Sequence, residues 1–254
     1  MGARIALLSA SLLLSAPSLA CAMTAPEGGV DLSAAFDIPS NTADSANSDY
    51  VETVLGQVAS SLSACAACKS DGLVVIVDRS AKQTIMVVSR DGANDWNLLY
   101  FGHVSTGKPG RKEHFKTPTG AFVLDGSILD YRAEGTYNEN HIRGIGLKGS
   151  RVWDFGWQET EDWRTEGHTV KIRMEMHATD PANLEHRIGR ADSEGCIRIH
   201  ADLNKVLDRY GVLDAAPNQL AQDGSAAWRQ VLGRDHVYLG EAGNTLVIVD
   251  SSHD

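Results

Sequence analysis

Short apolar stretches separated by glycine, proline and aspartate run through the middle of this chain. Residues 73–78 form a continuous run rich in β-branched side chains, and residues 83–88 form a second run after a short polar turn. Residues 96–104 and 120–124 continue the pattern, with a Gly- and Pro-containing loop at 105–119. Runs of this length and composition predict strands. Successive short strands favour an antiparallel sandwich or barrel over a doubly wound sheet.

Helical periodicity appears on both sides of these strands. Within residues 49–70, apolar side chains recur at helical spacing and predict an amphipathic helix packed on the domain. Residues 201–210 predict a second helix, with Leu203 and Leu207 facing inward and Gly211 at its end.

The chain after the second helix, residues 213–254, is expected to complete the domain. A helix is predicted near Trp228. Residues 236–239 and 245–249 are predicted to form a last hairpin.

One further strand leads to the candidate chemistry. Residues 170–176 alternate apolar and charged side chains, which predicts a half-buried strand whose charged face is solvated, Arg173 and Glu175 included. The strand delivers His177, and Cys196 follows downstream, directly after a glycine. A thiol attacks carbonyl groups well as thiolate, and a positioned imidazole can generate that thiolate.

The segment that contains the cysteine, residues 193–196, reads Ser-Glu-Gly-Cys and is typical of a tight turn. Such a turn exposes the sulfur, and the N–H groups of Gly195 and Cys196 can hold the oxyanion of an acyl-transfer intermediate. Ser193 is expected to shape the turn or to hydrogen-bond the intermediate.

Two other interpretations apply to these residues. A free cysteine is commonly a buried structural residue, and a lone histidine can simply be satisfied at a strand end. A zinc site could also be assembled from several side chains, but the frames His-x-x-x-His and His-Glu-x-x-His are missing, so we predict no metal and no cofactor. The side chains in question are His177, Asp180, His186, Cys196 and His200.

The composition is that of a globular domain with an acidic balance. Hydrophobic residues make up 43% and charged residues 22%, and the formal net charge is −10. An acidic chain is poorly suited to nucleic acid or to an anionic membrane surface as its main partner. We expect a monomer with neither a nucleic-acid partner nor stable membrane insertion.

The N-terminal residues 1–22 are typical of a secretory signal peptide. Arg4 supplies the positive charge, a short apolar run follows, and residues 20–22 read Ala-Cys-Ala, a small-residue cleavage site. The apolar run is too short to span a bilayer. We expect an exported protein, periplasmic or cell-wall associated, with the signal peptide removed. Cys21 leaves a lipoprotein open despite a poor lipobox, and residues 23–48 are predicted to be a flexible linker.

Two more cysteines form a Cys-x-x-Cys motif, Cys65 and Cys68. In an oxidising compartment this spacing favours a small structural disulfide. A redox pair would require a preceding strand and a following helix, the reverse of the predicted order here.

The motif around the cysteine resembles the signature of the L,D-transpeptidases, the YkuD family. Fifteen residues separate His177 from Ser193, and Gly195-Cys196-Ile197-Arg198 completes the pattern. A second hallmark lies upstream, in the runs Val104–Gly107 and Thr117–Phe122.

The resemblance covers residues 72–212 and implies a mostly β catalytic domain with a few peripheral helices. It also implies that the carbonyl of Ala178 orients the imidazole of His177, and that the substrate is a peptidoglycan stem peptide. Such peptides are rich in carboxylates, which suit arginine, so Arg198 and Arg190 are candidate substrate-binding residues.

One departure stands beside the nucleophile, where the family's usual histidine before Gly-Cys is Glu194. A neighbouring carboxylate disfavours thiolate, unless Arg190 or Arg198 neutralises it.

Together these observations predict an exported acyltransferase that forms cross-links through a Cys196 thioester. Two alternatives stay open. The same acyl-enzyme could be resolved by water, giving an L,D-carboxypeptidase or a peptidase that releases wall proteins. A non-catalytic peptidoglycan-binding module would instead make Glu194 the mark of a decayed site.

Overall fold

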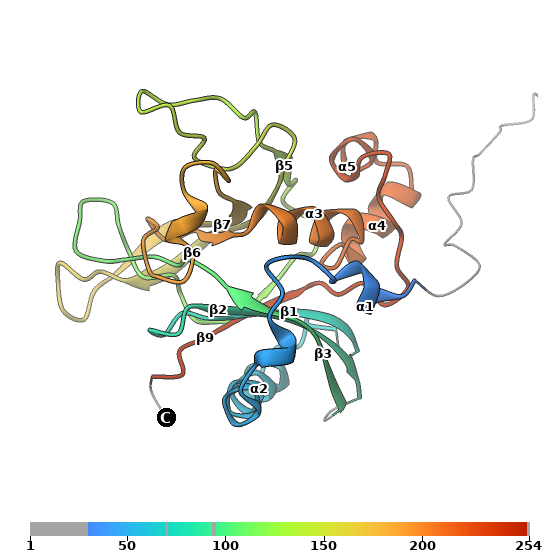
Figure 1. The fold of residues 1–254 in the computed structure, drawn as a ribbon, viewed down its shortest axis with the longest axis horizontal. Coiled ribbons are helices and arrows are strands. Elements are labelled where there is room, and N and C mark those ends of the chain that lie inside the picture. Colours follow the sequence, from blue (N-terminus) through green and yellow to red (C-terminus); the bar gives the residue numbers. More distant parts are fainter. Residues whose placement is uncertain (1–29, 70, 93–94, 253–254) are drawn as a thin grey trace, which may run out of the picture.

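The computed structural model describes residues 30–69, 71–92 and 95–252, and they form two packed β-sheets (Figure 1). The predicted signal peptide and Cys21 lie outside the described residues. The first sheet has the order β3-β2-β1-β9-β4 and the second the order β5-β6-β7-β8. The strands of the first sheet are β1 Gly72–Asp78, β2 Thr84–Asp91, β3 Asp95–His103, β4 Gly120–Val123 and β9 Thr245–Val249. Those of the second are β5 Tyr131–Arg132, β6 Arg151–Glu161, β7 Thr169–Ala178 and β8 Ile197–Ile199.

The mostly β fold class is confirmed, but both sheets are mixed rather than purely antiparallel. β9 pairs in parallel with β1, and β8 pairs in parallel with β7. The predicted hairpin of residues 236–239 with 245–249 is wrong, because the first stretch is not a strand and β9 lies between β1 and β4.

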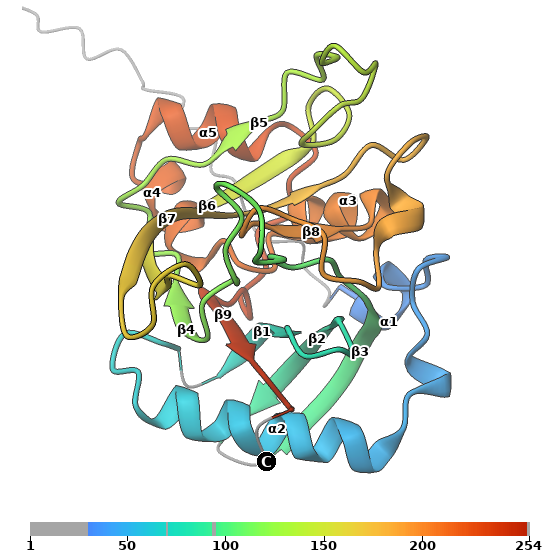
Figure 2. The same ribbon diagram turned by 90° about the vertical axis from the view of Figure 1, so that its left-hand side faces the viewer.

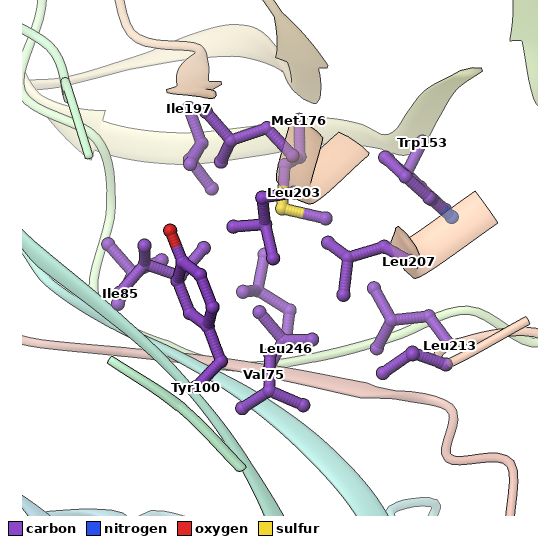
Figure 3. Close-up of a cluster of buried hydrophobic side chains, with 14 of the residues drawn as sticks. Val75, Ile85, Tyr100, Trp153, Met176, Ile197, Leu203, Leu207, Leu213 and Leu246 are labelled. Atoms are coloured by element: carbon purple, nitrogen blue, oxygen red, sulfur yellow. The ribbon is translucent and has the colours of Figure 1, made fainter. Parts of the chain in front are cut away.

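The main core lies between the two sheets. Side chains from the first sheet meet side chains from the second sheet and from α3, Ala201–Arg209. Figure 3 shows Val75 and Leu246 below, Met176 and Ile197 above, and the leucines of α3 between them.

A second cluster lies on the opposite face of the first sheet, where α2, Ser48–Ser63, packs (Figures 1 and 2). Val54, Val58 and Leu62 of α2 cover alternate residues of β1, β2 and β9. β1 is thus buried on both faces, which explains its continuous apolar sequence. The helix is shorter than predicted: after Ser63 the chain turns into a disulfide between Cys65 and Cys68.

The predicted linker is corrected for residues 30–48. This stretch contains α1, Leu32–Ala35, and a 3-10 turn, Ala43–Ser45. Leu32 and Phe36 are buried in the main core, because a short run of apolar side chains within a polar stretch is enough to anchor it.

The C-terminal part adds α4, Ala215–Gln222, and α5, Ala226–Leu232, and a buried ion cluster joins this part to the second sheet. Arg151 of β6 is fully buried, and its Nη2 lies 2.8 Å from Asp130 and 3.0 Å from Asp214. Two carboxylates around one guanidinium supply the pairing that a buried charge requires. A short 3-10 turn, Glu185–Arg187, lies in the β7–β8 connection.

Among the described residues, no helix is both long enough and apolar enough to cross a membrane.

Candidate active site

The pairing of β7 with β8 brings the predicted nucleophile and base onto one sheet face. In this parallel pair Met176 lies opposite Ile197 and His177 opposite Arg198. Met176 and Ile197 point into the core. Because side chains alternate along a strand, His177, Arg198 and Cys196 point away from the core, on the outer face.

The turn that carries Cys196 is held by its own serine. The hydroxyl of Ser193 donates to the carbonyl of Cys196 at 2.6 Å and accepts from the N–H of Gly195 at 3.2 Å. Gly195 has a φ of 141°, which favours glycine, and a Cβ there would lie 2.7 Å from Cδ1 of Ile172. The local sequence Ser-Glu-Gly-Cys therefore folds into a closed turn ahead of β8.

The loop at 105–119 is bonded directly to this turn, and Figure 2 shows it in green near β8. The hydroxyl of Thr117 donates to the carbonyl of Gly195 at 2.8 Å and accepts from the N–H of Gly107 at 2.9 Å. Phe115 donates its N–H to the carbonyl of Glu194 at 3.1 Å. The upstream hallmark residues thus hydrogen-bond to the cysteine turn and support it. The Thr-Pro and Gly residues of this loop predict a turn but not these contacts.

His177 is buried and held in one orientation. Its Nδ1 lies 2.7 Å from the carbonyl oxygen of Ala178, the contact that the family resemblance implied. A carbonyl oxygen only accepts, so Nδ1 carries the hydrogen and Nε2 keeps its lone pair. Burial, helped by the positive charge of Arg198, lowers the pKa of His177 to about 4. The imidazole is therefore neutral at neutral pH, as a general base must be.

Cys196 is a free, partly buried thiol. Its Sγ lies 4.0 Å from the carbonyl oxygen of Arg173, and no hydrogen bond within the described part of the chain joins Sγ to His177. Burial raises the pKa of Cys196 to about 11, and the carboxylates of Glu175 and Glu194 act in the same direction. The resting pair is therefore a neutral thiol and a neutral imidazole.

The two candidate arginines differ. Arg198 is partly buried, and its Nη1 donates to the carbonyl of Asp192 at 3.1 Å, so the side chain is fixed beside the turn. Arg190 is exposed, and none of the described residues forms an ion pair with it. Arg198 is therefore the better placed of the two for a substrate carboxylate.

Within the described part of the chain, neither Arg190 nor Arg198 forms an ion pair with Glu194. Glu194 is exposed, and Nε2 of His114 lies 4.0 Å from its Oε1. The carboxylate points into solvent because its backbone is held in the turn. Water screens an exposed charge, which reduces the penalty that Glu194 places on the thiolate.

Sequence reasoning missed a group of side chains next to the thiol. Glu175 was expected to be solvated with Arg173, but its side chain is only 15% exposed and lies on the same face as Cys196. It accepts a hydrogen bond from the hydroxyl of Tyr131 at 3.0 Å. The alternation of β7 could have placed Glu175 on the face of His177; its burial depends on β5 and β6, which that strand's pattern does not show.

The described residues were compared with the zinc site that the sequence could assemble on paper. Among the described residues, no three His, Cys, Asp or Glu side chains lie together in a way that could hold a metal ion.

A mostly β two-sheet domain with a turn-held thiol, an oriented neutral imidazole and a fixed arginine on one face has the groups that cysteine acyl transfer requires. Comparison with protein families matches residues 72–220 to the YkuD family, the L,D-transpeptidase catalytic domain. The match spans more than half of the chain, which therefore belongs to this family, whose members act on peptidoglycan. A search of curated proteins found no significant match.

Proposed function

We propose that this protein is an exported L,D-transpeptidase that cross-links peptidoglycan stem peptides through a thioester on Cys196. The observation that carries the proposal is the shared face of β7 and β8, where the oriented imidazole of His177 and the thiol of Cys196 lie two residues apart in register. The predicted signal peptide supports export, since the substrate lies outside the cytoplasm.

In the first half-reaction, the sulfur of Cys196 attacks the carbonyl of the L-centre of diaminopimelate in a tetrapeptide stem. Nε2 of His177 takes the thiol proton, and the N–H of Cys196 receives the oxyanion, since the N–H of Gly195 is bonded to Ser193. The C–N bond to D-Ala breaks, and His177 gives its proton to the leaving amine. The product is a thioester and free D-Ala.

In the second half-reaction, an amine of a neighbouring stem attacks the thioester and the C–S bond breaks. The proton released from the attacking nitrogen passes through His177 to the sulfur. Arg198, fixed at the edge of the turn, is placed to bind a carboxylate of either stem.

The direct test is intact-protein mass after incubation with a carbapenem, whose strained lactam carbonyl forms a thioester with an activated cysteine of this family. We expect one adduct on the wild-type protein and none on Cys196→Ala. Cys65 and Cys68 serve as an internal control, because they are joined and cannot react in the folded, oxidised protein. Two results contradict the proposal. One is an adduct that persists in Cys196→Ala, and the other is the lack of an adduct on folded wild-type protein whose Cys196 thiol is reduced.

Digestion of treated cell-wall sacculi then separates the two outcomes of the acyl-enzyme. New diaminopimelate-to-diaminopimelate cross-links indicate a transferase, whereas shortened stems without new cross-links indicate a hydrolase.

A further inference from the structure

Glu175 is the acidic residue nearest to the nucleophile in the strand register. Met176 pairs with Ile197, so Glu175 lies beside Cys196 on the outer face of the second sheet. The N–H of Glu175 favours the thiolate, while its carboxylate opposes it. The carboxylate thus acts on the sulfur electrostatically.

The position of this carboxylate is fixed by its neighbours. It accepts a hydrogen bond from Tyr131 at 3.0 Å, and Nε of Arg173 lies 3.6 Å away. Arg173 is shared with the fully buried Asp154, to which its Nε donates at 3.0 Å. Two carboxylates therefore share one half-exposed guanidinium, and a net negative charge remains on this side of the thiol.

A positive charge also acts on the thiol. Arg198 lies on β8, two residues beyond Cys196 and across from His177. A molecule that bears an ammonium and a carboxylate would find a complementary charge for each group near the sulfur.

A cavity of about 420 Å³ is lined in part by Tyr131, the residue that donates a hydrogen bond to Glu175. Its lining includes Glu134, Gly135, Gly144 and Ile145. This volume is in the usual range for the binding site of a small ligand.

We propose that Glu175 selects the second substrate: its carboxylate binds the ammonium group of the amine that resolves the Cys196 thioester, with the rest of that amine lying toward Tyr131. This inference rests on the proposed function and deepens it, because it identifies the residue that favours an amine over water.

The chemistry of the step balances as follows. The bound ammonium gives one proton to Glu175 and becomes a neutral amine, which attacks the thioester carbon. The C–S bond breaks, the second proton leaves the nitrogen through His177 and reaches the sulfur, and an amide forms. Glu175 then releases its proton to water. Burial raises the pKa of Glu175 above its ordinary value, which suits it to take that proton.

Glu175→Gln tests the proposal because it moves the two half-reactions in opposite directions. Acylation by a carbapenem should be as fast as in the wild type or faster, since a charge that disfavours thiolate is gone. We expect the ratio of transfer to hydrolysis to fall with a tetrapeptide donor and a diaminopimelate-containing acceptor. The fall should be about tenfold to a hundredfold, which corresponds to the free energy that a charge-assisted hydrogen bond typically contributes. The KM for the acceptor should rise, and the donor KM should not.

Glu159→Gln is the matched control, because Glu159 is an exposed carboxylate on the neighbouring strand β6, opposite Lys171 and remote in register from Cys196. It should keep the wild-type ratio. An unchanged ratio in Glu175→Gln, an equal loss in Glu159→Gln, or a parallel loss of acylation and transfer overturns the inference. If the wild type forms no thioester, the proposed function fails and this inference falls with it.

If Glu175→Gln does not fold, the wild-type enzyme answers the same question. A trimethylammonium analogue of the acceptor carries the charge but cannot attack. It should compete with the acceptor and leave hydrolysis of the thioester unchanged. Lack of competition at concentrations well above the acceptor KM also overturns the inference.

Discussion

The chemistry of single residues decides how this site starts its reaction. Burial raises the pKa of Cys196 and lowers that of His177, so neither carries a charge at rest. A thiolate–imidazolium pair would require the opposite shifts. The site thus behaves as a neutral pair in which the substrate must be present before the proton moves.

The alkylation rate of Cys196 should follow this high pKa. With a pKa of about 11, the thiolate fraction at pH 7 is about two orders of magnitude below that of a free cysteine, whose pKa is near 8.5. Iodoacetamide labelling, followed by mass, should be slow at pH 7 and should still rise above pH 9. Free glutathione is the control, and an inflection near pH 8 in the protein would contradict the prediction.

Gly107 offers a second test at the residue scale. A Cβ at this position would lie 2.0 Å from the carbonyl oxygen of Phe115 and 2.9 Å from Cα of Gly195, both of them backbone atoms that cannot step aside. Gly107→Ala should therefore displace the cysteine turn and reduce carbapenem acylation at least tenfold. Gly110→Ala is a control in the same loop, because a Cβ there meets nothing within 4 Å, although its φ of 106° adds strain. Equal acylation rates in Gly107→Ala and the wild type would show that the loop does not support the turn.

At the scale of elements, the buried Arg151 joins β6 to the C-terminal region. Arg151→Met would leave Asp130 and Asp214 buried without their cation. Removal of one partner from a buried ion group typically costs about 3–5 kcal/mol. Urea unfolding at pH 7 should show a loss of that size.

Arg164→Met is the control, because Arg164 pairs with Asp162 at an exposed turn, where water screens the pair, and this variant should lose far less stability. Similar losses in the two variants would mean that the buried cluster contributes nothing special to stability.

The sequence predicted elements well where local pattern decides them. β1 and β7 fall within one or two residues of their predicted limits, and β2 ends three residues later than predicted, at Asp91. The position of β9 was not predictable, because its pairing with β1 and β4 depends on residues far apart in the chain. The candidate site shows the same division. His177 and Cys196 could be predicted because they belong to a local sequence motif, whereas the burial of Glu175 depends on contacts from β5 and β6.

At the scale of the whole molecule, buried titratable groups oppose one another as pH falls. His177 and His236 have a pKa of about 4 in the folded state, and Asp130 and Asp214 have a pKa of about 6. Burial is the first cause in each case. The histidines stabilise the fold above pH 6.5, and this contribution is lost as pH falls toward 4, because the unfolded chain takes up protons first. The aspartates contribute in the other direction over nearly the same window, since they bind protons first in the folded state.

A substitution at His236 should expose this balance. Its Nε2 lies 2.7 Å from Oδ1 of Asn218, and an amide could keep that hydrogen bond, so His236→Gln removes the titration with little loss of packing. A shift from 6.5 to about 4 corresponds to about 3 kcal/mol. The stability of the wild type relative to His236→Gln should therefore fall by up to that amount between pH 7 and pH 4. Urea unfolding of both proteins at several pH values measures the difference, and a difference that does not change with pH would show that His236 titrates alike in the folded and unfolded chains.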